Sequence, residues 1–183
     1  MSHDRETLAA IAARIIVESE LTDWSLARRK ASAELGLAAH GAPLPSDDEI
    51  IAEIKTYHSL YSDSEFTLQL QSQREYALEA MAELIRFNPV LIGPVAEGWA
   101  HAGSEIRIEL DAENSKEVEY TLINLEVEFT PSMTRDGSEQ FTIDDGDWPM
   151  KLIVRPRGRA PDARFKIRLN GQQLSDLLAS RPD

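Results

Sequence analysis

Residues 91–110 read L-I-G-P-V-A-E-G-W-A-H-A-G-S-E-I-R-I-E-L, and this stretch decides the predicted fold. The apolar run Val90–Ile92 stops at a glycine, which is typical of a short buried strand. Residues 104–110 then alternate between polar and apolar side chains, which predicts a second strand with one buried face. Gly93 and Gly98 predict a turn between the strands with room for one helical turn. The stretch therefore predicts two strands joined by a glycine-rich turn, with a row of charges on one face of a sheet.

Upstream of this stretch, apolar residues recur at helical spacing. The spacing predicts helices over residues 4–20 and 24–35, a third opened by a Ser46–Glu49 capping box, and a longest one that ends before Pro89. Four helices of this kind favour an up-and-down arrangement, the last member of which leads directly into the strand at Val90. In the third helix, His58 could be a ligand or a base, but a lone histidine among aromatic and aliphatic neighbours is more often a packed residue.

Downstream, residues 115–123 are predicted to form a short helix. Residues 125–129 alternate up to Pro131 and predict a half-buried strand. Further alternating runs predict added antiparallel strands over residues 141–143, 150–154 and 165–169. The predicted fold class is α+β, with a helical, bundle-like region over residues 1–88 and a mixed sheet with flanking helices over residues 89–183.

Composition excludes several classes of site. The 183 residues include no cysteine, which excludes disulfides, thiolate metal sites and a cysteine nucleophile. The formal net charge of −13 argues against nucleic-acid binding, because the overall field repels phosphate backbones. No segment is apolar and long enough to span a membrane, and the N-terminal residues lack the pattern of a signal peptide. A cytoplasmic protein is expected.

The spacing in residues 91–110 resembles that of the polymerase-beta-like nucleotidyltransferase superfamily in its small, minimal form. In that family a strand ending in Gly-Ser leads through a helical turn with another glycine to a strand carrying Ser-Asp-hydrophobic-Asp. Gly93 and Gly98 match the two glycines, Ser104 the serine and Glu105 the first metal-binding aspartate. The resemblance implies a nucleotidyltransferase-like sheet and ligand-binding roles for Gly93, Gly98 and Ser104.

Two positions depart from the family pattern: Pro94 replaces a serine and Arg107 replaces the second carboxylate. Residues two apart on a strand lie about 6.6 Å apart on one face, which suits carboxylates that share closely spaced metal ions. Glu105 and Glu109 are about 13 Å apart along the strand and cannot form such a pair. Arg107 brings a permanent cation between them, and Pro94 removes a backbone N–H from the loop. These departures predict loss of metal-dependent catalysis and a site without metal.

The family takes a third carboxylate from a neighbouring strand, and the order of elements makes Glu126 or Glu128 the candidate. The alternative interpretation is two solvent-facing glutamates. We hypothesise that Arg107 neutralises a cluster of Glu105, Glu109 and one of these two glutamates. The degenerate site is thus marked by Glu105, Arg107, Glu109 and Glu128.

Basic residues gather in two places. The run Arg28-Arg29-Lys30 could contact phosphate, or it could be a solvated face paired with nearby acids. Arg155, Arg168 and the basic residues between them could dock a phosphate-bearing partner, or they could balance Asp144, Asp145 and Asp147.

The favoured function is a catalytically degenerate nucleotidyltransferase-like protein with a binding or regulatory role, acting on a protein partner or a nucleotide-like ligand. The alternative is an active nucleotidyltransferase with a rearranged set such as Glu105, Glu109 and Glu128. Only that alternative implies a cofactor, which would be Mg²⁺. A third interpretation is a structural or regulatory helical module.

Overall fold

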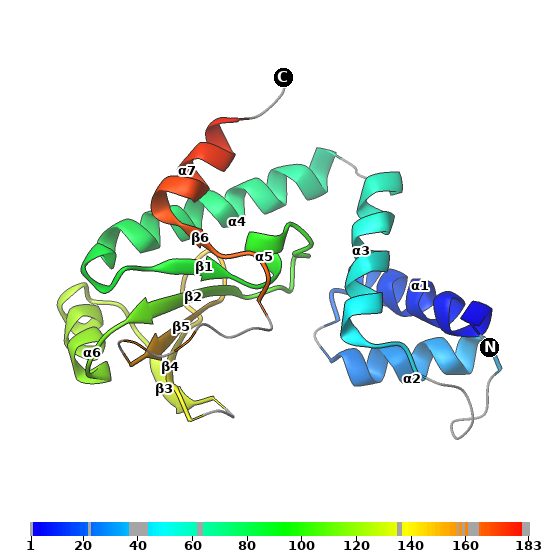
Figure 1. Ribbon diagram of the computed structural model, residues 1–183, viewed down its shortest axis with the longest axis horizontal. Helices are drawn as coiled ribbons and strands as arrows, with labels where there is room; N and C mark the ends of the chain where they lie inside the picture. Colours follow the sequence, from blue (N-terminus) through cyan, green and yellow to red (C-terminus); the bar gives the residue numbers. More distant parts are fainter. Residues whose placement is uncertain are drawn as a thin grey trace. The chain divides into compact units, whose positions relative to one another are not determined.

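The computed structural model describes residues 2–21, 23–36, 44–61, 64–134, 137–156, 158, 160 and 165–180 (Figure 1). The helices are α1 (Ser2–Glu18), α2 (Trp24–Glu34), α3 (Asp47–Tyr61), α4 (Ser64–Glu83), α5 (Pro94–Glu97), α6 (Ser115–Asn124) and α7 (Gly171–Ala179), with one 3-10 turn, η1 (Ile85–Phe87). The strands are β1 (Val90–Ile92), β2 (Ile106–Asp111), β3 (Thr130–Met133), β4 (Glu139–Ile143), β5 (Met150–Arg155) and β6 (Leu169–Asn170). The predicted α+β class, with N-terminal helices before a mixed sheet, is confirmed.

The chain forms two compact units. The helical unit comprises residues 1–69 and 99–104, and the sheet unit comprises residues 70–98 and 105–183. The predicted arrangement of four helices is not found, because α4 belongs to the sheet unit from Leu70 onward. The predicted division into a helical region up to residue 88 and a sheet region from residue 89 stays a prediction.

The helical unit is built around α1, which packs against both α2 and α3. Its core is apolar and includes Leu8, Ile16, Ile50 and Ile54, which are fully buried. Trp99 joins this core from the segment between α5 and β2, with its ring edge-on to Trp24 at 5.6 Å between centroids. Burial of these side chains supplies the main stabilisation of the unit, at about 1.5–3 kcal/mol for each large aliphatic side chain.

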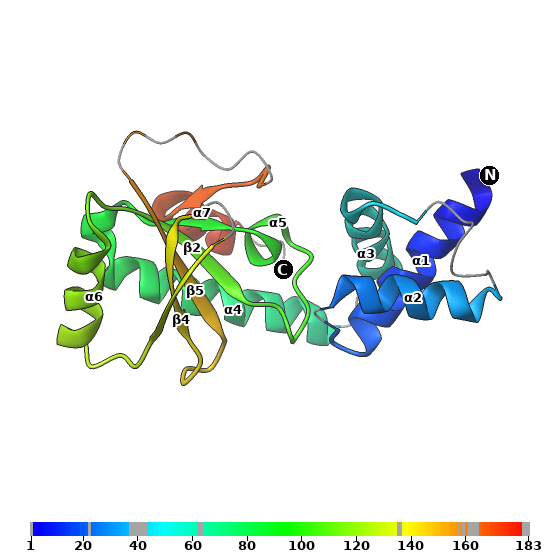
Figure 2. The same ribbon diagram turned by 90° about the horizontal axis from the view of Figure 1, so that it is seen from below.

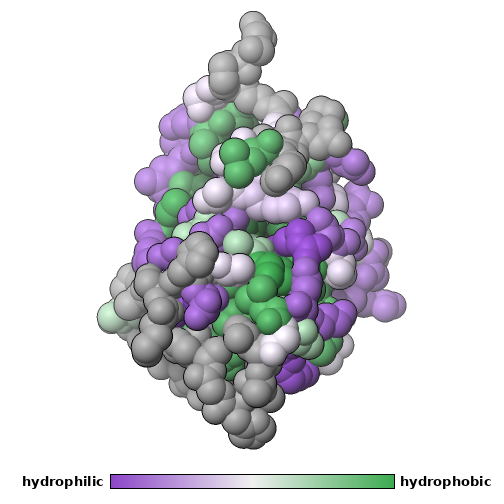
Figure 3. Space-filling view, turned by 90° about the vertical axis from the view of Figure 1, so that its right-hand side faces the viewer, coloured by the Kyte–Doolittle hydropathy of each residue, from purple (hydrophilic) through white to green (hydrophobic). Residues whose placement is uncertain are grey.

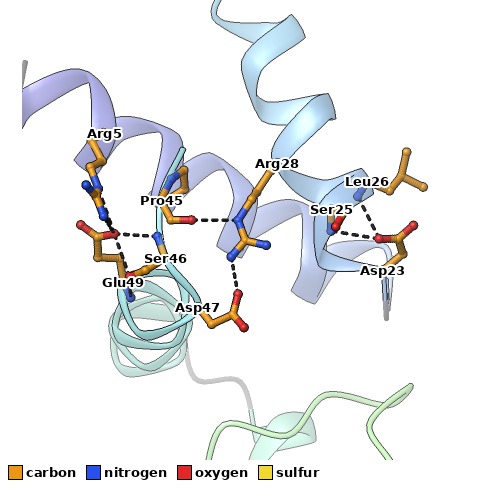
Figure 4. Close-up of polar contacts among 9 residues, drawn as sticks. All are labelled: Arg5, Asp23, Ser25, Leu26, Arg28, Pro45, Ser46, Asp47 and Glu49. Carbon is orange, nitrogen blue, oxygen red and sulfur yellow. Dashed lines mark hydrogen bonds and ion pairs between the residues drawn. The ribbon is translucent and has the colours of Figure 1, made fainter. Parts of the chain in front are cut away.

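Local side-chain caps fix where α2 and α3 begin (Figure 4). Asp23 Oδ1 accepts hydrogen bonds from the N–H groups of Ser25 and Leu26 at 2.9 and 3.0 Å. Before α3, the Glu49 N–H donates to Ser46 Oγ at 3.3 Å, and the Ser46 N–H donates to Glu49 Oε2 at 2.7 Å. The predicted capping box is confirmed, and such boxes satisfy N–H groups that a helix cannot pair internally.

The first basic residue of the run in α2 has a structural role. Arg28 Nε donates to the Pro45 carbonyl oxygen at 2.8 Å, and its guanidinium pairs with Asp47 (Figure 4). Arg28 thereby ties α2 to the start of α3, which confirms pairing with a nearby acid for this residue. Arg29 and Lys30 are exposed.

On the face in Figure 3, hydrophilic side chains border smaller apolar areas. Leu44, Leu60 and Leu68 are exposed residues of the helical unit. Scattered apolar side chains of this kind are normal on protein surfaces. No helix in the part of the chain that the structure describes combines the length and apolarity needed to cross a lipid bilayer.

The sheet has the strand order β3-β4-β5-β2-β1-β6. β2 and β5 are parallel, and the other neighbours are antiparallel. β1 and β2 are adjacent, with Leu91 opposite Ile108, which confirms the predicted pairing. One face carries buried apolar side chains. α4 runs above β1 in Figure 1 and passes behind the strands in Figure 2. Alternation places the other side chains of β2 on the opposite face.

Two predicted strands are wrong. Residues 125–129 form no strand, because α6 ends in a hydrogen-bonded turn there: the Leu125 N–H donates to the Thr121 oxygen, and the Val127 N–H to the Leu122 oxygen. Glu126 adopts a left-handed conformation (φ 57°) within this turn. Closure of the helix end uses the backbone groups that a strand would need, and β3 begins only at Thr130. Residues 165–168 are likewise outside any strand, and only Leu169–Asn170 pair with β1.

Candidate functional site

The second face of β2 carries charged side chains. Ile106, Ile108 and Leu110 point to the buried face, so Arg107 and Glu109 point to the other. The parallel register of β5 sets Lys151 opposite Arg107. We call this surface the charged face; it consists of Glu105, Arg107, Glu109, Lys151, Arg155 and Arg168.

The outer group of the charged face has one carboxylate between two cations. Lys151 Nζ lies 2.6 Å from Glu105 Oε1, and Arg107 Nη2 lies 3.4 Å from Glu105 Oε2. The side chains of Glu105, Lys151 and Arg107 are 29%, 28% and 37% exposed. These three groups can therefore be reached from solvent. Of the cluster that Arg107 was hypothesised to neutralise, only the pairing with Glu105 is confirmed, and Lys151 makes the shorter contact with that carboxylate.

The inner group is more deeply buried. The Glu109 side chain is only 5% exposed, and its Oε2 lies 3.0 Å from Arg155 Nη1 and also pairs with Arg168 Nη2. A buried carboxylate requires such compensation, because desolvation otherwise makes the charged form unfavourable. Glu109 is thus neutralised by arginines from β5 and from the segment before β6, and no contact with Arg107 is found among the described residues.

The basic residues near the C-terminal end therefore have a different partner from the one predicted. Arg155 and Arg168 pair with Glu109, a residue of β2, whereas the sequence suggested Asp144, Asp145 and Asp147. Arg157, Arg159 and Arg164 lie outside the described residues.

Gly93 borders the charged face. It adopts φ 74° and ψ −154° immediately before α5, a conformation that side chains disfavour. A Cβ atom at this position would lie 3.4 Å from Arg107 Cδ and 3.7 Å from Phe165 Cε1. The glycine therefore allows the chain to turn where Arg107 and an aromatic ring approach it.

Gly98 and Ser104 have structural roles in the conformation described. Gly98 ends α5 in a left-handed conformation, and its N–H donates to the Pro94 oxygen at 2.9 Å. Ser104 belongs to the helical unit, where its Oγ accepts a hydrogen bond from the His101 N–H at 3.0 Å. The predicted ligand-binding roles of both residues stay predictions.

The candidates for a third carboxylate lie elsewhere in the sheet unit. β3 is separated from β2 by β4 and β5, so residues near the start of β3 do not reach the charged face. Glu128 instead lines a pocket of about 310 Å³ with Phe129, Thr130, Thr142, Asp144 and Asp145. Glu126 is exposed in the turn after α6. The hypothesis that either glutamate joins Glu105 and Glu109 is wrong, because their strand was misplaced.

The charged face does not fit a divalent metal ion. Metal carboxylates need free oxygens that converge on the ion, but Glu105 and Glu109 pair with ammonium and guanidinium groups. Among the described residues, no group of three or more histidine, aspartate or glutamate side chains is arranged to hold a metal.

Sequence reasoning missed Lys151 and Phe165 as neighbours of Arg107. Polar and apolar residues alternate within residues 150–154, so Lys151 could have been placed on the same face as Arg107 if the parallel pairing with β2 had been known. Phe165 carries no local signal of this kind.

Comparison with protein-family models, curated proteins and solved structures gave no match. The resemblance to nucleotidyltransferases therefore rests on residues 91–110 alone.

Proposed function

We propose that this protein is a non-catalytic, nucleotidyltransferase-like binding protein that holds a nucleotide-like ligand on its charged face without a metal ion. The observation that carries the proposal is the outer group, in which Arg107 and Lys151 are partly exposed beside each other on adjacent strands. Guanidinium and ammonium groups at one surface are the usual partners of phosphate oxygens.

The balance of charge supports an anionic ligand. Four cations on this face, Arg107, Lys151, Arg155 and Arg168, meet three carboxylates: Glu105, Glu109 and the neighbouring Asp111. This local excess of positive charge contrasts with the net charge of −13 for the whole chain. A local field of this sign concentrates anions at the face even when the molecule as a whole repels them.

The aromatic ring beside Arg107 favours a nucleotide over a simple anion. Phe165 and Arg107 both approach Gly93, so the ring lies on the side of the outer group that Arg107 occupies. Stacking of a base on an aromatic ring contributes about 1–3 kcal/mol. We also propose that the protein acts in the cytoplasm, as expected from its sequence.

The alternative, an active transferase, would need Glu105 and Glu109 to release their cations and take up Mg²⁺. Electrostatics oppose this, because a divalent cation would have to enter beside Arg107, Lys151, Arg155 and Arg168. We therefore expect no transfer of label from any common nucleoside triphosphate, with Mg²⁺ or with Mn²⁺.

Calorimetric titration with ATP in the presence of EDTA tests the proposal. The wild-type protein should bind, and Arg107→Ala or Lys151→Ala should weaken binding by about tenfold or more, since a charge-assisted hydrogen bond contributes about 1.5–3 kcal/mol. Arg86→Ala is the matched control, because Arg86 is an exposed cation of the sheet unit paired with Glu117. Binding that requires Mg²⁺, or metal-dependent transfer of label, would favour the active transferase.

A further inference from the structure

We infer that Glu105 is an internal competitor for the ligand, so that the charged face accepts di- and triphosphate groups and excludes singly charged anions. The inference rests on the proposed function and names the ligand class of the same site. Its basis is the position of the Glu105 carboxylate, which already pairs with both outer cations. Its oxygens lie 2.6 Å from Lys151 Nζ and 3.4 Å from Arg107 Nη2.

The outer group is the part of the charged face that a ligand can enter. Its three side chains are between 28% and 37% exposed, whereas Glu109 of the inner group is 5% exposed. In the inner group, the buried Glu109 carboxylate already pairs with Arg155 and Arg168. A phosphate group that reaches Arg107 and Lys151 must displace the Glu105 carboxylate from them.

Glu105 competes strongly because the backbone holds it in place. The next residue, Ile106, donates its N–H to the Pro149 oxygen at 2.9 Å, and the register of β2 and β5 fixes Arg107 opposite Lys151. A tethered group acts at an effective concentration in the millimolar range or above, which a free ligand must exceed.

This competition sets a threshold that depends on ligand charge. A carboxylate ligand carries the same single charge as Glu105, so it gains nothing to offset its loss of free motion. A diphosphate carries more charge on two adjacent groups and can contact both cations at once. The displaced Glu105 side chain is 29% exposed and can turn toward water, so its displacement leaves no buried, unpaired carboxylate behind.

Metal-free titrations with inorganic pyrophosphate and with acetate test this role, using Glu105→Gln. The variant should bind pyrophosphate about tenfold more tightly than the wild type. Acetate binding should be measurable only in the variant. Glu83→Gln is the control, because Glu83 is an exposed acid at the end of α4 and its loss changes the net charge by the same amount. Circular dichroism before titration verifies that the variants are folded.

The outcomes separate this inference from the proposed function. If wild-type protein binds pyrophosphate and Glu105→Gln binds it equally or more weakly, Glu105 is not a competitor, although the charged face is still a binding site. If neither protein binds pyrophosphate or ATP, both proposals are wrong. Glu105→Asp provides a second variant: it keeps the charge on a shorter side chain, so a value between wild type and Glu105→Gln supports displacement of the carboxylate.

Discussion

The helical unit buries two imidazole rings, those of His58 and His101, whereas the sheet unit buries the carboxylate of Glu109 between two guanidinium groups. In the helical unit the His58 ring packs against an aromatic side chain: it is stacked on Phe66, with 3.6 Å between ring centroids and 13° between ring planes. In the sheet unit the buried charge is compensated by opposite charges from distant parts of the chain. The helical unit buries these rings in surroundings that favour their neutral form, whereas the sheet unit compensates a buried carboxylate with two guanidinium groups.

The pKa shifts of the two histidines follow from this packing. Burial lowers the pKa of His58, and the nearby His101 lowers it further. Burial also lowers the pKa of His101, although the negative charge of Glu20 opposes the shift. His101 Nδ1 accepts a hydrogen bond from the Gly103 N–H at 3.2 Å, which requires that nitrogen to be unprotonated. Both shifts therefore favour neutral rings in the folded helical unit.

The largest effect is expected from Trp99→Ala. Trp99 is 7% exposed and packs in the core of the helical unit, although its sequence position lies between two elements of the sheet unit. Removing a buried aromatic side chain of this size should cost about 3–5 kcal/mol. Hydrogen exchange should show faster exchange in α1 and α3 than in wild type, and little change in β2 and β5. Loss of protection in the strands alone would contradict the assignment of residues 99–104 to the helical unit.

A somewhat smaller loss is expected from Glu109→Ala. The substitution leaves Arg155 and Arg168 without their shared carboxylate, and it should cost about 3 kcal/mol, at the low end for a broken buried ion pair because both arginines keep some exposure. Urea unfolding and hydrogen exchange in β2 and β5 would measure it. Glu83→Gln serves as the surface control. A cost similar to that of the control would mean that the sheet unit does not depend on its buried charge.

The smallest change in stability is expected when the pH is lowered. Since the folded-state pKa values of His58 and His101 lie below the unfolded value of about 6.5, the unfolded chain takes up more protons as the pH falls through that value. The stability of the helical unit should therefore decrease on acidification, by about 1.4 kcal/mol for each unit of pKa difference. All four histidines of the sequence fall in residue ranges of the helical unit, so the sheet unit should show no such dependence between about pH 7.5 and about pH 5.5, roughly one unit either side of 6.5.

His58→Phe separates this effect from general acid sensitivity. The substitution keeps a ring that can stack on Phe66 and removes one of the two titrating groups. Urea unfolding of the variant should depend less on pH than that of the wild type. An unchanged pH dependence would show that His58 is protonated equally in the folded and unfolded chains.

Features that depend on neighbours in sequence were predictable. The Ser46–Glu49 box and the Asp23 cap act over two or three residues, so residue type and spacing suffice to identify them. Alternation in residues 104–110 likewise identified a strand with one charged face, and the apolar run Val90–Ile92 identified its neighbouring strand, although the antiparallel direction of the pair was not predicted. Arg107 and its pairing with Glu105 also followed from spacing along one strand.

Alternation failed at residues 125–129, because the same pattern of glutamates and apolar residues closes α6 through backbone hydrogen bonds. With the strand misplaced, Glu128 was assigned to the wrong site, and it lies instead in the pocket beside β3. A periodic pattern of five residues is short enough to suit either a strand or a helix end, and only the competition for backbone groups decides between them.

The helices, the two strands around Gly93 and the charges on one face could be predicted from residue type and spacing, because each depends on contacts within a few residues. The pairing of particular cations with particular carboxylates depends on the tertiary structure. Glu109 and Arg168 are 59 residues apart, and their contact depends on β6 pairing with β1 at the sheet edge. Lys151 reaches Glu105 only because β5 lies parallel to β2. Strand order and register are properties of the whole sheet, so the composition of the charged face follows from folding and not from any local spacing.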